Sequence, residues 1–149
     1  MGFLLLDNGD LLQGTPLADH LAARYCANPD DPEPHPVALV MNALGYDAMG
    51  LGNHDFDYGV DYLARFARDL ELPLISSNTD ILAPAPWLKP SVMLQVGSLA
   101  VGVLSVLPAR TMKWSHVNLS GRADIRTIPD SVEREAAHLR SQARNWWSL

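Results

Sequence analysis

The sequence has one cysteine, no long apolar run and no cluster of basic residues. Cys26 cannot form a disulfide within the chain, so thiol usage does not indicate a cellular compartment. The apolar opening ends at Asp7, far short of a membrane span, and it lacks the basic start and the cleavage site of a secretory signal. The 11 Lys and Arg residues are scattered among 17 acidic residues, with a net charge of -6. We therefore expect neither membrane insertion nor binding to long nucleic acid.

The length and composition of the sequence indicate one globular domain. Hydrophobic residues make up 48% of the 149 positions and charged residues 19%, which is enough apolar material for a buried core. Short apolar runs predict strands, and apolar residues at helical spacing predict helices. The expected strands are 3–6, 48–51, 74–76, 92–96 and 99–106; the expected helices are 16–27 after Thr15, one from Pro36 to Gly45, one after Gly59, and one capped by Asp130 with Glu133. The last two strands form a hairpin in this interpretation, and the sum is an α/β layered fold with a mixed sheet.

Two polar clusters follow predicted strands, at residues 7–10 and 52–57. The carboxyl ends of strands are where α/β proteins usually build their sites. The glycine in each cluster lets the backbone turn sharply and bring polar side chains together. Carboxylate, amide oxygen and imidazole are also the ligand types that hard divalent cations accept. The two clusters together therefore indicate metal-assisted hydrolysis.

Each residue of the clusters also has a simpler interpretation when taken alone. Asp10 is of a type that commonly caps a turn, and Asn53 is of a type that is common in turns. His54, which acidic residues flank, is also compatible with a solvated loop histidine. Only the conjunction of both clusters after consecutive short strands favours the metal site.

Longer stretches around these clusters resemble a known family. Residues 4–16 read LLLDNGDLLQGTP, residues 41–47 read MNALGYD, and residues 52–59 read GNHDFDYG. These stretches are similar to the calcineurin-like metallophosphoesterases, and more narrowly to the bacterial periplasmic nucleotidases. Residues 113–116 and 119–122 resemble the branch that hydrolyses 2',3'-cyclic nucleotides and 3'-nucleotides, rather than the 5'-nucleotidase and UDP-sugar hydrolase branch.

The resemblance implies a role for four residues. Asp10 matches the carboxylate that bridges two divalent metal ions, and Asn53 matches the amide-oxygen ligand of the second metal. His54 matches the catalytic histidine that faces the substrate phosphate, and Asp57 matches the acid that orients it. The mixed oxygen and nitrogen ligands suit Mn, Zn, Co or Mg. The implied partner is a small nucleotide substrate.

The family pattern also contains an Asp-x-His pair on an earlier strand, then a further His and a Gly-His-x-His loop, none of which this sequence contains. We therefore expect a fragment that is inactive alone. Its metallophosphoesterase domain is partial at residues 1–142 and incomplete at both ends. Residues 143–149 depart from the family's usual continuation, and we interpret them as a frameshifted tail. Codons GCG CGG AAC TGG TGG TCG CTN, which are compatible with these residues, give Ala-Glu-Leu-Val-Val-Ala in the frame two bases later. Nucleotide sequencing tests this interpretation.

The alternatives concern the whole protein. The first expectation is a periplasmic 2',3'-cyclic-nucleotide phosphodiesterase and 3'-nucleotidase whose C-terminal domain, which grips the nucleoside, is missing here. The second is a 5'-nucleotidase or UDP-sugar hydrolase. A third is a non-catalytic remnant or binding domain, and a fourth is a short protein that completes its metal site with another chain. The periplasmic location is implied only by the family.

Overall fold

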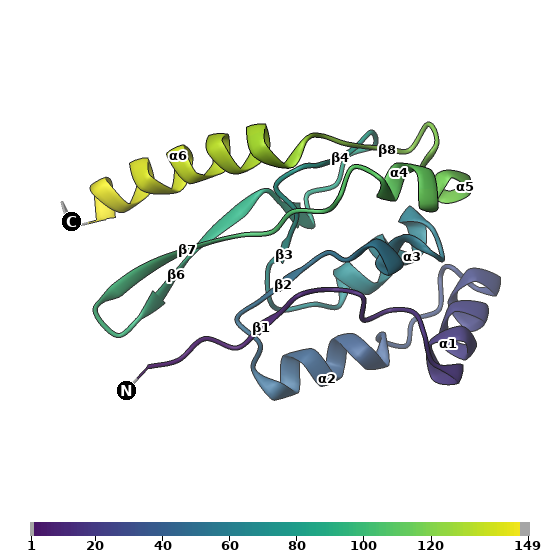
Figure 1. The fold of residues 1–149 in the computed structure, drawn as a ribbon. Helices are drawn as coiled ribbons and strands as arrows, with labels where there is room; N and C mark the ends of the chain where they lie inside the picture. Colours follow the sequence, from purple (N-terminus) through teal and green to yellow (C-terminus); the bar gives the residue numbers. More distant parts are fainter. Residues whose placement is uncertain (1, 147–149) are drawn as a thin grey trace.

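The computed structural model describes residues 2–146, with side chains as far as Ala143. The elements in chain order are β1 (Leu6–Asp7), α1 (Pro16–Ala27), α2 (Pro36–Leu44), β2 (Ala48–Gly50), the 3-10 turn η1 (Asn53–Phe56), α3 (Val60–Arg68), β3 (Leu74–Ile75), β4 (Thr79–Ile81), β5 (Leu88–Lys89), β6 (Ser91–Val96), β7 (Leu99–Leu104), α4 (Thr111–Trp114), α5 (His116–Leu119), β8 (Ala123–Ile125) and α6 (Ile128–Trp146). Figure 1 shows strands β1 to β3 between the group α1, α2 and α3 and the extended hairpin β6–β7 with α6.

The central sheet has the order β1-β2-β3-β5, and its neighbours are parallel. Leu6 pairs with Ala48, and Met49 pairs with Leu74. The antiparallel strands form two separate two-stranded sheets, β4 with β8 and the hairpin β6–β7. The predicted α/β layered fold is confirmed. In the described residues, however, the antiparallel strands pair only with each other and do not join the parallel sheet, so the predicted single mixed sheet is divided into separate sheets.

Local sequence signals set the first three helices as predicted. The Thr15 side chain accepts a hydrogen bond from the backbone N–H of Ala18, and Pro16 occupies the first helical turn of α1. Helix α2 ends at Gly45, whose φ of 70° is the left-handed conformation that glycine adopts readily. In α3, Leu63 and Phe66 are fully buried at helical spacing.

Several boundaries and burial predictions are wrong. The apolar run from Phe3 begins pairing only near its end, and the Phe3 side chain is 83% exposed because no described segment covers it. Leu17, in the first turn of α1, is also exposed, at 62%. Helix α6 begins at Ile128, so Asp130 lies inside its first turn instead of capping it, and its carboxylate accepts a hydrogen bond from the Thr127 hydroxyl.

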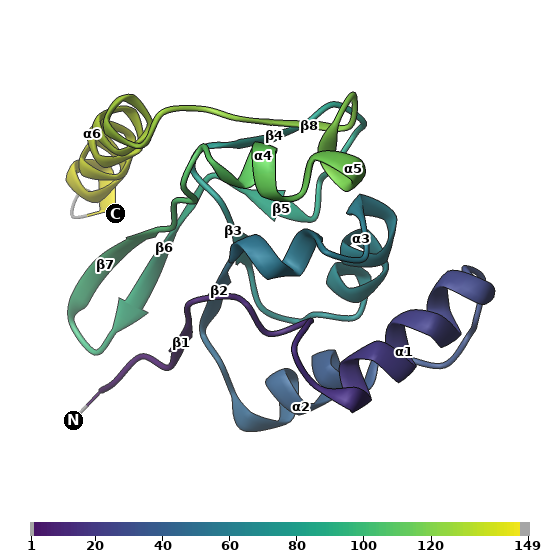
Figure 2. The same ribbon diagram turned by 45° about the vertical axis from the view of Figure 1, so that its right-hand side comes forward.

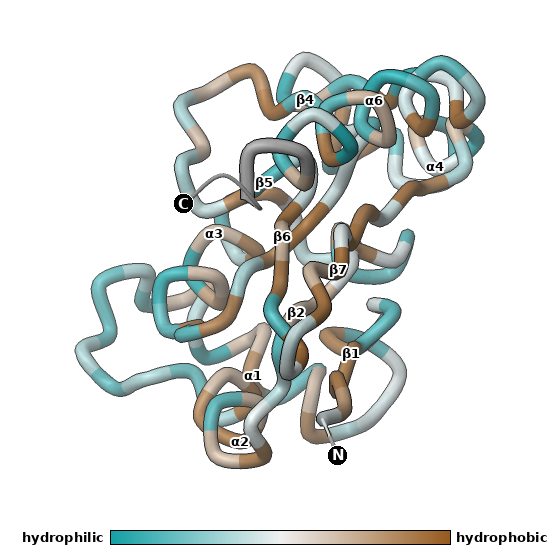
Figure 3. The backbone as a smooth tube through the Cα atoms, turned by 90° about the vertical axis from the view of Figure 1, so that its left-hand side faces the viewer, coloured by the Kyte–Doolittle hydropathy of each residue, from teal (hydrophilic) through white to brown (hydrophobic). Residues whose placement is uncertain are grey.

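The hydrophobic core lies between the central sheet and helices α1 to α3. Its largest fully buried members are Phe56, Phe66, Met49, Leu63 and Leu74. Figure 2 shows that α6 and the hairpin β6–β7 extend away from this core, and hydrophobic stretches run along β2, β6 and β7 in Figure 3. Among residues 2–146, no helix is both long enough and apolar enough to cross a membrane.

The predicted boundary at residue 142 lies within α6. Residues 147–149 of the interpreted tail lie outside the described residues, so the frameshift stays a prediction.

Candidate active site

The two predicted polar clusters meet at one end of the central sheet. Asp10 lies in the loop after β1, and Asn53 and His54 open η1 directly after β2. Strands β1 and β2 are parallel neighbours, so the loops that follow them leave the sheet on the same side. The backbone N–H of His54 donates a hydrogen bond to Asp10 Oδ1 at 2.9 Å. The structure therefore brings these three residues together.

Two glycines allow the loops to approach this closely. Gly9 has a φ of 84°, and a Cβ placed on it would lie 2.1 Å from the backbone nitrogen of Gly52. A Cβ placed on Gly52 would lie 2.1 Å from Asp10 Oδ1. Any larger residue at these two positions would have to push the loops apart, because the obstructing atoms are mostly backbone. The glycines thus set the distance between the two clusters.

A buried carboxylate that the sequence analysis gave no role fastens the two loops. The Asp55 side chain is fully buried. Its Oδ2 accepts hydrogen bonds from the backbone N–H groups of Gly52 and Asp10, and its Oδ1 accepts from those of Leu11 and Leu12. Burial raises the pKa of the Asp55 carboxyl, and the four N–H donors act in the opposite direction. Asp55 is therefore a positioning residue for Asp10, recognisable in sequence only as one acid among several.

Asp10 itself is exposed and adopts an uncommon backbone conformation. Its φ of 59° makes it the one non-glycine residue with positive φ in the described chain. Aspartate tolerates this left-handed region better than most residues, and such conformations often mark functional sites. The hydrogen bonds of its N–H to Asp55 and of its Oδ1 with His54 hold the strained geometry in place. Asp10 is therefore fixed with its carboxylate at the junction of the loops.

The fourth candidate, Asp57, contacts the imidazole of His54. Nδ1 of His54 lies 2.7 Å from Asp57 Oδ2. This hydrogen bond raises the pKa of the His54 imidazole, and the charges of Asp57, Asp10 and Asp55 act in the same direction. With Nδ1 held by Asp57, Nε2 is the ring nitrogen left for a substrate. The side chain of Asn118 in α5 donates to the Asp57 carbonyl at 2.8 Å, which anchors this loop to a second segment.

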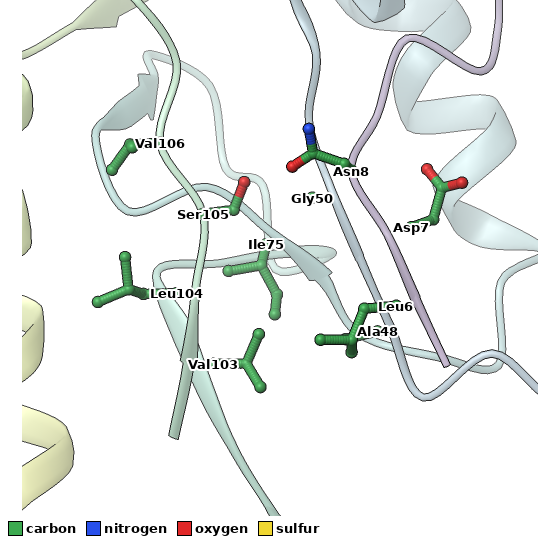
Figure 4. Close-up of a pocket in the computed structure, with 10 residues that line it drawn as sticks. All are labelled: Leu6, Asp7, Asn8, Ala48, Gly50, Ile75, Val103, Leu104, Ser105 and Val106. Atoms are coloured by element: carbon green, nitrogen blue, oxygen red, sulfur yellow. The ribbon is translucent and has the colours of Figure 1, made fainter. Parts of the chain in front are cut away.

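Asn53, His54 and Asp57 line a pocket of about 520 Å³ together with Trp114 and Ser115. This size is within the range of small-molecule sites. Figure 4 shows a different, more apolar pocket between the central sheet and the segment 103–106, which none of the four candidate residues lines. Trp114 and Ser115 lie in a stretch that resembles the family, but the sequence did not predict them as site residues. Trp114 is the last residue of α4 and Ser115 follows it, and the tertiary structure brings both to the pocket.

The described residues fit a divalent metal only in part. Asp10 and Asn53 offer oxygen atoms of the right type, and the Asp10 carboxylate is held at the junction of the two loops in an uncommon backbone conformation. Within residues 2–146, however, no three His, Cys, Asp or Glu side chains gather closely enough to hold a metal ion. Asp10 and Asn53 alone give fewer ligands than a metal ion in a protein requires.

The other histidines are either buried in the core or exposed on helices. His35 is fully buried, stacks on Tyr25 and hydrogen-bonds through Nε2 with the Tyr62 hydroxyl. Burial lowers its pKa to about 4, so it is neutral in the core. His20, His116 and His138 are exposed on α1, α5 and α6.

Comparison with known proteins gives a consistent result, although no family model matches the chain. The chain is 31% identical over 149 aligned residues to the 2',3'-cyclic-nucleotide 2'-phosphodiesterase/3'-nucleotidase of Salmonella typhimurium, with 93% of this chain and 23% of that protein aligned. It is 37% identical to the 5'-nucleotidase of Rattus norvegicus, with 88% and 22% aligned. The crystal structure of the calcineurin-like phosphoesterase YfkN from Bacillus subtilis superposes with a TM-score of 0.81 at 30% identity, covering 93% of this chain and 45% of that one.

The chain thus spans about a quarter of the length of these curated relatives. The similarity nevertheless extends over nearly all of this chain, in sequence and in fold. By sequence and fold, this chain is a homologue of the 2',3'-cyclic-nucleotide 2'-phosphodiesterase/3'-nucleotidases and the 5'-nucleotidases, and its structural neighbours include calcineurin-like phosphoesterases.

Proposed function

We propose that this chain forms part of the catalytic domain of a hydrolase that cleaves phosphate esters of nucleotides, and that its preferred substrates are 2',3'-cyclic nucleotides and 3'-nucleotides. The observation that carries the proposal is the hydrogen bond between the His54 amide and the Asp10 carboxylate at the junction of two glycine-tightened loops. The sequence relatives with nucleotidase names support the substrate class.

In this proposal Asp10 and Asn53 are metal ligands. The Asp10 carboxylate and the Asn53 amide oxygen would contribute to holding two divalent metal ions. Such a metal pair activates water and neutralises the phosphoryl oxygens. Mn, Zn, Co or Mg would suit the ligands. The remaining ligands would come from outside the described residues, either from further sequence of a longer protein or from a partner chain.

In this proposal His54 is the general acid that donates a proton or a hydrogen bond during cleavage of the ester. The Asp57 hydrogen bond raises the pKa of His54, so the imidazole keeps its proton to a higher pH than an ordinary histidine. Because Asp57 occupies Nδ1, the Nε2–H faces away from that bond and can donate to the phosphoryl group or to the departing ester oxygen. Asp57 would orient the ring and favour the protonated form.

The decisive assay uses the full-length gene product loaded with Mn²⁺. We expect it to release phosphate from 3'-AMP and to open 2',3'-cyclic AMP faster than it hydrolyses 5'-AMP or UDP-glucose. His54→Ala is expected to lower kcat by about 10²- to 10⁴-fold, the usual contribution of a general acid. The exposed His20→Ala is the matched control and should leave kcat unchanged.

A preference for 5'-AMP or UDP-glucose would favour the second candidate function, which the rat 5'-nucleotidase similarity supports. Absence of hydrolysis with every substrate would refute the catalytic proposal and favour a binding domain or a remnant. The 149-residue chain alone is expected to be inactive, because it lacks ligands. A periplasmic location and the aberrant origin of residues 143–149 are parts of the same proposal, to be checked by fractionation and by sequencing the gene.

A further inference from the structure

The carbonyl oxygen of Asp57 has one hydrogen-bond donor among the described residues. Asp57 follows the turn η1 and lies outside any helix or strand, and no backbone N–H group of residues 2–146 donates to its carbonyl. The donor is the side-chain amide of Asn118 in α5, at 2.8 Å. The two residues are 61 positions apart in the chain. The end of the turn that carries His54 is therefore tied to α5 through a single amide.

Helix α5 is itself held on both sides of Asn118. Leu119 is fully buried, and Ser115, which precedes the helix, is also buried. Beyond the helix, the Arg122 guanidinium forms an ion pair with Asp61 on α3. Figure 2 shows α4 and α5 beside α3. The Asn118 amide is thus presented from a fixed support.

The Asp57 side chain passes this restraint on to the imidazole of His54. Asp57 Oδ2 lies 2.7 Å from His54 Nδ1. The His54 side chain is 49% exposed, so packing alone does not fix the ring and its orientation depends on this hydrogen bond. A shift of Asp57 would therefore move the imidazole. Misplacing a catalytic group by about 1 Å can cost about 100-fold in rate.

We propose that Asn118 is a positioning residue for the His54–Asp57 pair: its amide fixes the backbone of Asp57, and the Asp57 carboxylate in turn fixes the His54 ring. This inference rests on the proposed function and deepens it, because it adds a residue outside the pocket to the groups that support His54. Among the described residues, Asn53, Trp114 and Ser115 line the pocket with this pair, and Asn118 does not. We therefore expect Asn118 to act on the chemical step and not on substrate binding.

The simplest alternative is that Asn118 only ties α5 to the domain. In that case its loss would lower stability, and any effect on the rate would be the same whether or not His54 is present. If Asn118 positions the pair, its effect on the rate requires His54. A double-mutant cycle separates these two roles.

The test measures kcat for hydrolysis of 3'-AMP by the full-length protein loaded with Mn²⁺. Asn118→Ala is expected to lower kcat about 10- to 100-fold and to change KM much less. Asn118→Asp, which keeps the size of the side chain but lacks the N–H donor, should give a similar loss. In the His54→Ala background, Asn118→Ala should cause no further loss, because the group that it positions is gone. Val117→Ala is the matched control, since Val117 is 93% exposed on the same helix, and it should leave kcat unchanged.

A second measurement needs no catalysis. The proton on His54 Nδ1, which is hydrogen-bonded to Asp57, should give a downfield NMR resonance in the wild-type protein that is absent from His54→Ala. Asn118→Ala should broaden or abolish this resonance, and Val117→Ala should retain it. Urea unfolding of Asn118→Ala shows whether the variant is folded when both measurements are made.

The inference is overturned if a folded Asn118→Ala keeps its kcat, if it loses the same factor with and without His54, or if the His54 resonance is unchanged. If Asn118→Ala does not fold, the same three comparisons are made with Asn118→Asp. If the wild-type protein hydrolyses no nucleotide, the proposed function fails, and the His54 resonance then decides whether Asn118 holds the pair.

Discussion

Replacing Asp55 by asparagine is expected to loosen both loops of the site. The wild-type carboxylate accepts four backbone N–H groups, two on each oxygen. Asparagine keeps one oxygen, so two buried N–H groups lose their acceptor and face an NH₂ group instead. Each buried donor without a partner costs about 1–3 kcal/mol, so Asp55→Asn should destabilise this domain by about 2–6 kcal/mol.

Two measurements on the full-length protein check this value. Urea unfolding reports the loss of stability, and hydrogen exchange should show faster exchange of the amides of Gly52 and Asp10 than in the wild type. Asp30→Asn is the control, because Asp30 is exposed on the surface after α1. A change below about 1 kcal/mol for Asp55→Asn, with amide protection unchanged, would refute the reasoning.

Four further predictions concern the same site. Asp57→Asn removes the carboxylate charge and weakens the hydrogen bond, both of which raise the pKa of His54, so the alkaline limb of the pH–kcat profile should move to lower pH; a limb that stays in place would contradict the pairing. Because the pKa of His54 is raised in the folded protein, the His54–Asp57 pair should stabilise the fold fully at pH values below the ordinary histidine pKa. This stabilisation should be lost as the pH rises through the raised pKa. Urea unfolding across pH 5–9 would reveal it as a difference between wild type and Asp57→Asn. Asp10→Asn should lower the metal content measured by elemental analysis, and EDTA should abolish hydrolysis until Mn²⁺ is returned; full activity in EDTA would refute the metal proposal. Gly9→Ala places a Cβ 2.1 Å from the backbone nitrogen of Gly52 at a position with positive φ and should destabilise the domain by about 1–3 kcal/mol, whereas Gly14→Ala, where the added Cβ meets no neighbour, shows the cost of positive φ alone.

Local signals predicted much of the fold. The Thr15 cap, the left-handed Gly45 and the hairpin turn between β6 and β7 depend on residues close in sequence, and the structure has all three. The loops after β1 and β2 were also predictable, because glycine-containing polar clusters that follow parallel strands meet at one edge of a sheet.

Short strands were missed because two or three residues carry no visible periodicity. Strands β4 and β8 exist through pairing with each other, as Thr79 with Ile125, and this pairing joins segments far apart in the chain. The exposure of Phe3 was likewise invisible, since an apolar run is buried only where a neighbour covers it.

The sequence by itself determined the chemistry available at the site, because Asp10, Asn53, His54 and Asp57 and the glycines around them are sequence facts with family counterparts. Only the tertiary structure decided how they are held, since the Asp55 carboxylate joins two loops more than forty residues apart through hydrogen bonds to backbone N–H groups, which carry no residue identity. The same holds for Trp114, which lines the pocket because long-range packing places α4 beside the His54 loop.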